Sequence, residues 1–185
     1  LMTDFLLDKL RTQDPDRLYS LQIRAADYLA QINPEEAVHL YLKAGSTDRA
    51  LSLMDGHAQT MFEAGRIETL QIWSRRLFNH GQTSPRVELY LVGGCLDRGH
   101  LDEAEQHLQR AFNTLETIDA TDQLKDQGGL QDLRPLQNLR LTWVRARNFQ
   151  ARLALQRGNF NEVFQAVEQA ELLLSQQPAP LEKAT

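Results

Sequence analysis

The stretch "RGHLDEAEQHLQRAF", residues 98–112, decides the fold. Its glycine, Gly99, precedes an amphipathic run in which Ala104, Leu108 and Ala111 fall on one face of a helix. A glycine in this place takes the left-handed conformation that ends one helix. The small residue five positions later lets two helices approach closely. The stretch therefore predicts the turn of a helical hairpin.

The same pattern recurs at three other glycines. It is found in "GSTDRA" (Gly45–Ala50), "GRIETL" (Gly65–Leu70) and "GNFNEV" (Gly158–Val163). A related turn, "INPEEA" at Ile32–Ala37, places a proline where it can start a helix. The recurrence predicts an array of hairpins rather than one.

Polar residues beside these turns are predicted to cap the helices that follow. Asn33, Ser46 and Asn159 are of the types that accept hydrogen bonds from the first free backbone N–H groups of a helix. The helix after the last turn is predicted to bury a face made of Val163, Val167 and Ala170.

This pattern is typical of tetratricopeptide-like repeats, whose hairpins must stack because one hairpin cannot bury its apolar face alone. We therefore expect an all-α fold of such hairpins in a right-handed superhelix. The glycines are irregularly spaced, and only the interval from Gly65 to Gly99 matches the period of about 34 residues. Helices are expected over residues 2–12, 15–31, 34–44, 47–64, 66–79, 85–98, 101–118, 135–157 and 159–176. The polar segment 119–134, which contains Gly128-Gly129, is predicted to be a loop or insertion.

Composition excludes several classes of protein. The 185 residues carry a formal charge of −5, which argues against nucleic-acid binding by this chain itself. The single cysteine, Cys95, excludes an internal disulfide framework. No apolar run reaches membrane-spanning length and no signal peptide is recognised, so a cytoplasmic protein without a membrane is predicted. The two ends of the sequence predict a piece of something larger.

The first 112 residues resemble the MalT-like, LuxR-type transcriptional regulators of the STAND class. The resemblance rests on "FLLDKL", "DPDRLYSLQIRAADYLAQ", "PEEAVHLYLKAGSTDRALSLM" and "SPRVELYLVGGCLDRGHLDEAEQHLQRA". The matching residues are Phe5, Leu10, Arg24-Ala25-Ala26, Tyr28, Glu36-Ala37-Val38-His39, Ala44-Gly45, Arg49-Ala50, Gly65, Leu70 and Trp73. One departure is Ile32-Asn33-Pro34, where the family often has glycine.

The resemblance implies an effector-sensing and oligomerisation arm of a signal-responsive regulator. Residues 1–12 would then leave a preceding winged-helix domain, residues 13–176 would form the repeat domain, and residues 177–185 would be a linker. The chain has no G-x-x-x-x-G-K-[ST] loop and no recognition-helix domain, so we expect it neither to hydrolyse ATP nor to read DNA. The implied partners are a small-molecule effector or a regulatory protein or peptide, together with self-association. A stand-alone repeat scaffold that binds protein or peptide is the alternative.

The sequence predicts no enzyme, cofactor or metal. His100 and His107 could share a helix face with Glu103 nearby, but surface or interhelical histidines fit the spacing better than a zinc site. Cys95 lies in "LVGGCLDRG", where a thiol is expected to be a core residue rather than a nucleophile. A hydrolase would need a clustered acid and base, and the sequence indicates none.

The segment 134–157 contains six arginines and no acid. At about 100° per residue, Arg134, Arg145 and Arg152 fall on one line of a helix, and Arg140 and Arg147 on a second. Arginine forks suit carboxylate or phosphate groups, so an anionic effector or acidic peptide could dock here. The predicted ligand-binding residues are Arg140, Trp143, Arg145, Arg147, Asn148 and Arg152.

The competing interpretation is that these arginines pair at the surface with acids of neighbouring helices. The acids available for such pairs are Asp102, Glu103, Glu105, Glu162, Glu168 and Glu171. The same helix is expected to be apolar on two sides and to lie between partners. One side carries Leu136, Leu139, Trp143 and Ala146, and the other Leu141, Val144 and Leu155.

Overall fold

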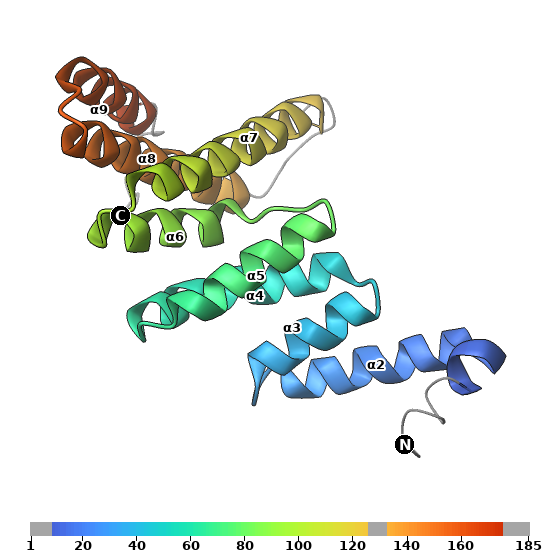
Figure 1. Cartoon of the computed structure of the whole chain (residues 1–185). Coiled ribbons are helices and arrows are strands. Elements are labelled where there is room, and N and C mark those ends of the chain that lie inside the picture. The colour runs from blue at the N-terminus through green and yellow to red at the C-terminus, as the bar shows by residue number, and fades with distance from the viewer. Residues whose placement is uncertain (1–8, 126–132, 176–185) are drawn as a thin grey trace, which may run out of the picture. The chain divides into compact units, whose positions relative to one another are not determined.

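The computed structural model describes residues 9–125 and 133–175, and only the backbone of residues 121–125 and 133–137 (Figure 1). Every regular element within these residues is a helix, so the all-α prediction is confirmed there. A short helical segment at 9–13 precedes α2. The helices are α2 (Pro15–Leu29), α3 (Pro34–Lys43), α4 (Thr47–Glu63), α5 (Ile67–Asn79), α6 (Pro85–Asp97), α7 (Leu101–Lys125), α8 (Leu133–Gln156) and α9 (Phe160–Ser175).

The predicted loop at 119–134 is wrong at both edges. The helix α7 continues to Lys125, and α8 begins at Leu133, two residues before the expected start at Pro135. Residues 126–132 lie outside the described part, as do 2–8 of the first predicted helix and the predicted linker 177–185. The polar composition of residues 119–125 therefore does not mark a break in the helix.

The chain separates into two compact units. The first, residues 1–82, contains α2 to α5, and the second, residues 83–185, contains α6 to α9.

One hydrogen bond recurs in the turns of both units. The residue after each turn glycine donates its backbone N–H to the carbonyl five residues earlier, over 2.8 to 3.0 Å. This bond pairs a carbonyl of the last helical turn that would otherwise lack a partner. It requires a left-handed residue, and the glycine has φ of 71° to 75° at each site. The glycines are Gly45, Gly65, Gly99 and Gly158, as predicted, together with Gly81.

The helix starts follow the sequence at most turns. The Asn33 side chain accepts a hydrogen bond from Glu36 N at 3.3 Å, and Asn159 accepts one from Glu162 N at 3.4 Å, so both predicted caps are confirmed. The third predicted cap is wrong, because the Ser46 side chain makes no capping hydrogen bond to α4. The backbone N–H of Ser46 donates to Tyr41 O, a carbonyl of the last turn of α3.

In the first unit, apolar residues of α3, α4 and α5 form the interior. Val38, Met54, Leu70, Trp73 and Leu77 are at most 1% exposed. Trp73, one of the residues of the family resemblance, is therefore a core residue.

A polar network joins three successive helices of the same unit. The Tyr41 hydroxyl on α3 donates to Asp27 on α2 at 2.6 Å, and Arg49 on α4 donates to the same carboxylate at 2.9 Å. The hydrogen bond from Tyr41, with the help of Arg49, lowers the pKa of Asp27. The carboxylate therefore stays ionised and holds both partners.

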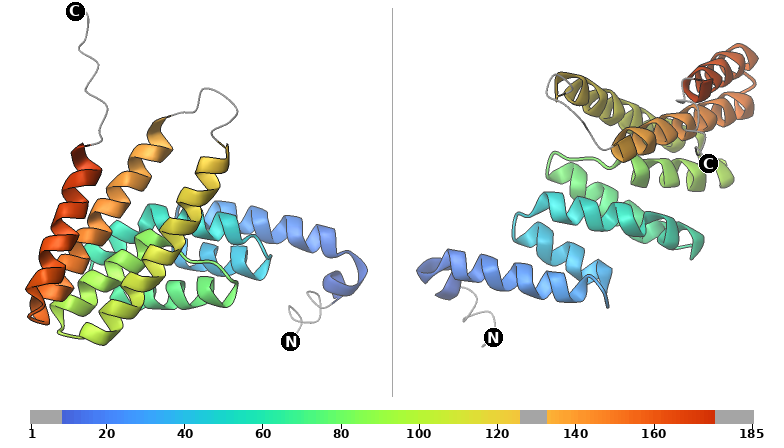
Figure 2. Two further views of the ribbon diagram at one scale, coloured as in Figure 1. Left: turned by 90° about the horizontal axis from the view of Figure 1, so that it is seen from above. Right: turned by 180° about the vertical axis from the view of Figure 1, so that it is seen from behind.

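In the second unit, α6 pairs with α7 and α8 with α9, and α8 also packs on α6 and α7. Figure 2 shows α8 and α9 side by side in both views. The shared core contains Leu89, Val92, Cys95, Leu96, Ala104, Leu108, Ala111, Phe112, Leu115, Ala146 and Leu153. The face of α7 predicted from the opening stretch is therefore confirmed.

Two predicted apolar faces of this unit need correction. On α9, Val167 is 41% exposed, and the buried residues are Ala166 and Ala170. On α8, Leu141 and Leu155 are 50% and 56% exposed. Small alanines lie at the crossing of α8 and α9 because they let the two backbones approach, which turns the larger residues outward.

The turn geometry predicts opposite effects for two glycine substitutions in the first unit. Gly65→Ala forces a left-handed alanine, at a cost of about 1–2 kcal/mol. Gly56→Ala lies inside α4 where an added Cβ meets nothing within 4 Å, so it should stabilise by about 0.8 kcal/mol. Urea unfolding followed by circular dichroism measures both. Shifts of the same sign would contradict the role assigned to the turn.

Candidate functional site

The predicted ligand-binding residues all lie on α8. Arg145, Asn148 and Arg152 are exposed, whereas Arg140, Trp143 and Arg147 are half-buried. All six residues therefore belong to one helix. Whether an arginine is available to a ligand depends on the contacts that it already makes.

Two of the exposed arginines contact α6. The Arg145 guanidinium lies 4.9 Å from the centre of the Tyr90 ring and donates to its hydroxyl at 3.4 Å. The Arg152 guanidinium donates to Asp97 at 3.0 Å and lies 5.8 Å from the Phe149 ring. Exposed contacts of this kind contribute at most about 1 kcal/mol each.

Arg147 is the most enclosed member of the set. Its guanidinium lies 4.6 Å from the centre of the Phe112 ring and 5.5 Å from that of Trp143, and it donates to Gln150 at 2.9 Å. The two rings are 5.7 Å apart. Burial lowers the pKa of Arg147, while Glu116 acts in the opposite direction. Trp143 and Arg147 therefore contribute to the packing of α7 on α8.

Arg157, the last arginine of the segment 134–157, also contacts side chains of a neighbouring helix. Arg157 donates to Asp102 at 3.0 Å and forms an ion pair with Glu105, also at 3.0 Å. The interpretation that acids of neighbouring helices pair with this arginine is confirmed. Ligand binding by the α8 residues stays a prediction, and the contacts show what a ligand would have to displace.

A buried acid on α6 was not foreseen. Glu88 is 1% exposed, and its carboxylate lies 2.6 Å from Nδ1 of His107 and 3.8 Å from Arg110, both on α7. A buried carboxylate is stable only with such partners. The signal in the sequence was a lone acid among apolar residues in "VELYLVGG".

The histidine pair considered for a metal is divided between two environments. His107 faces Glu88, whereas His100, which directly precedes α7, is exposed and lies 3.6 Å from Glu103 in the first turn of that helix. Among the described residues, no three His, Cys, Asp or Glu side chains are grouped to hold a metal ion. Cys95 is fully buried, as predicted, and burial raises the pKa of its thiol, which disfavours a nucleophilic thiolate.

A groove between α3 and α5 is the second candidate site. One hollow of about 490 Å³ is lined by three residues from each helix: His39, Leu42, Lys43, Arg76, Asn79 and His80. A second hollow of about 400 Å³ shares two of them and continues towards the helix starts, lined by Glu35, Glu36, His39, Thr69, Ile72, Trp73 and Arg76. The order of the lining residues shows that the two helices run parallel along the groove.

The hollow nearer the helix ends collects basic groups. Lys43 and Arg76 are joined there by His39 and His80, and no acid of the described part of the chain lines this hollow. Each helix contributes residues spaced three and four apart, which lie on one helix face. The sequence did not predict this site because its two walls come from different helices. The only local signal was a pair of basic residues four positions apart in each wall.

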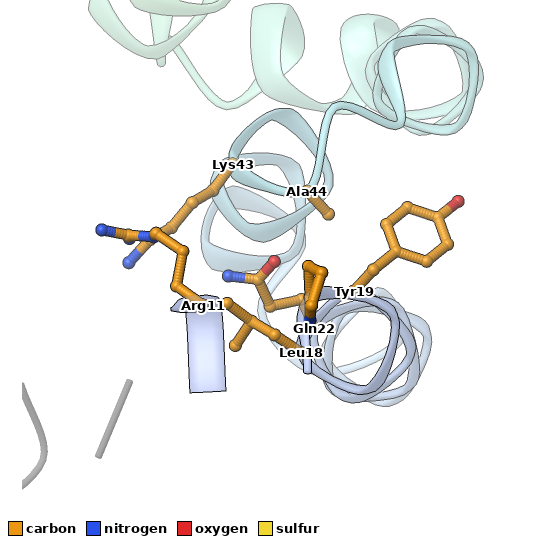
Figure 3. Close-up of a pocket in the computed structure, with 7 residues that line it drawn as sticks. Arg11, Leu18, Tyr19, Gln22, Lys43 and Ala44 are labelled. Carbon is orange, nitrogen blue, oxygen red and sulfur yellow. The ribbon is translucent and has the colours of Figure 1, made fainter. Parts of the chain in front are cut away.

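Lys43 also lines a smaller hollow of about 230 Å³ between α2 and α3. Figure 3 shows its side chain near Arg11, with the Gln22 amide between the helices and Tyr19 turned away. The basic character of the first unit therefore continues from the groove to this hollow.

Comparisons of the chain with protein-family models, curated proteins and solved structures found no match. None of the described helices is long and apolar enough to cross a membrane. The site must therefore be judged from its own geometry.

The buried pair predicts unequal effects for substitutions of His107 and His100. His107→Ala leaves the Glu88 carboxylate with Arg110 at 3.8 Å and should cost about 3 kcal/mol of stability. His100→Ala removes an exposed contact and should change the free energy of unfolding by less than about 0.5 kcal/mol. Thermal and urea unfolding of both variants test this. Equal losses would show that Glu88 does not depend on His107.

Proposed function

We propose that this chain is a non-catalytic effector-sensing and self-association arm of a MalT-like, LuxR-type transcriptional regulator. The proposal includes a tetratricopeptide-like, right-handed stacking of the hairpins. The observation that carries it is the repeated glycine turn, with the same backbone hydrogen bond after each of the aligned glycines. Arrays of such hairpins function by presenting extended surfaces to partners.

The mechanism requires differential affinity. An effector shifts an equilibrium between a locked and an assembly-competent form only if it binds one form more tightly. The α3–α5 groove suits this role because its two walls belong to different helices joined through α4. A ligand that contacts both walls would favour one spacing of these helices.

The domain plan belongs to the same proposal. Residues 1–12 would leave a winged-helix domain, residues 13–176 would form the repeat arm, and residues 177–185 would lead to the next domain. We also propose a cytoplasmic location, with neither nucleic acid nor membrane bound by this chain itself.

A repeat scaffold for a protein or peptide is the second candidate, and α9 favours it. Phe160, Phe164, Val167 and Leu174 are 63%, 73%, 41% and 43% exposed. Their spacing places them on one side of the helix. Such a face can receive an amphipathic helix of a partner.

A thermal-shift screen against metabolites, with sugars and phosphorylated sugars included, tests the sensing role. A true effector should raise the Tm with dose, and the stabilisation should reach about 2.7 kcal/mol at one hundred times its Kd. Light scattering on the same samples should show a change in molar mass. Stabilisation without any change in mass would contradict the self-association part. No metabolite-induced rise would contradict small-molecule sensing and favour the scaffold.

The double variant Arg145→Glu, Arg152→Glu tests the predicted α8 site with the metabolite found in that screen. Because both arginines already contact α6, we expect the affinity for the metabolite to change less than about twofold. A tenfold loss with an unchanged Tm would place the ligand on α8.

A further inference from the structure

We infer that the α3–α5 groove binds a small phosphate monoester that has hydroxyl groups on its body. The inference rests on the proposed sensing role, which it deepens by naming a site and a class of ligand.

The basic side chains that line the groove are unpaired in the described part of the chain. Within the described residues, the side chains of His39, Lys43, Arg76 and His80 make no hydrogen bond or ion pair. Arg145, Arg147 and Arg152 on α8, in contrast, all contact a ring, a carboxylate or an amide. Unpaired cations that converge on a hollow are available to a ligand, whereas paired ones are not.

The local helix dipoles do not cancel these charges. Lys43 and Arg76 lie in the last turns of α3 and α5, where each helix end carries about −0.5 of an elementary charge. The two side chains contribute a charge of +2, so the hollow stays positive before any histidine is protonated. An arginine fork beside a lysine ammonium suits a phosphate group.

The floor of the groove is buried and apolar. Leu42 and Trp73 are 7% and 1% exposed, and Arg76 stands half-buried beside them. A cation on such a floor is less hydrated than one in open solvent, so its interaction with an anion is stronger.

The other end of the groove has different chemistry. Glu36 and the Thr69 hydroxyl line it and can accept hydrogen bonds from ligand hydroxyls. Glu35 forms an ion pair with Arg66, so part of the negative charge at this end is compensated. Hollows of about 490 and 400 Å³ fall in the range for small-molecule sites. A ligand that places its phosphate at the basic end and its hydroxyl groups at this end would match both ends of the groove.

Calorimetric titration of the full 185-residue chain with glucose 6-phosphate, glucose and inorganic phosphate tests the inference. We expect glucose 6-phosphate to bind, and glucose to bind at least about tenfold more weakly because it lacks the anion. Arg76→Gln and Lys43→Gln should each weaken binding of glucose 6-phosphate about tenfold.

Arg75→Gln is the matched control, because Arg75 is exposed on the same helix, lines neither hollow, and loses the same charge. It should leave the affinity within about twofold. Equal weakening by Arg75→Gln and Arg76→Gln would overturn the site, since diffuse charge would then explain binding. Binding of neither phosphate probe, or equal affinity for glucose, would also overturn it.

The same samples separate this inference from the sensing role. If glucose 6-phosphate binds through Arg76 but light scattering shows no change in mass, the site stands and the self-association role fails. If another metabolite changes the mass equally in wild type and in Arg76→Gln, the sensing role stands and the groove is not its site.

Discussion

The described fold depends on one backbone hydrogen bond, from the residue after each turn glycine to the carbonyl five residues earlier. It ends a helix and fixes the direction in which the next one leaves. The residue five positions after the glycine is half-buried after Gly158 and exposed after Gly81, but it lies in the interior at the other three turns. Ala50, Leu70 and Ala104 occupy this place and are fully buried. Because only five residues separate the turn from the buried residue, each hairpin is specified by residues that are close in sequence.

A short hairpin still needs neighbours, and the two units meet this need with different chemistry. In the first, the Asp27 carboxylate collects donors from α3 and α4. In the second, arginines of α8 contact rings and acids of α6 and α7. The buried Glu88 links α6 to α7 through its ion pair with His107. A buried carboxylate adds little net stability over an apolar residue of the same shape, but a misplaced one is costly. It therefore favours one register of α6 on α7.

Sequence patterns predicted the elements of the described chain well because their signals are local. A glycine, a capping side chain and an apolar spacing all act within a few residues. The predictions were wrong where contacts with neighbouring helices decide the extent or the buried face of a helix. The polar residues 119–125 gave no sign that α7 would continue, and Val167 has the spacing of a core residue although Ala166 is the one that α8 covers. Ser46 is a capping residue type, but its side chain makes no capping hydrogen bond to α4.

Charge was harder to interpret than apolar spacing, and for a physical reason. A run of arginines in sequence says how many cations a helix has, but their availability is set by rings and acids that lie far along the chain. Arg152 and Asp97 are 55 positions apart, as are Arg145 and Tyr90. The α3–α5 groove shows the reverse case. Nothing in the sequence distinguishes Lys43 and Arg76, but they share a hollow that no acid among the described residues lines. A binding site for an anion is therefore indicated less by how many cations a helix carries than by which of them the fold leaves unpaired.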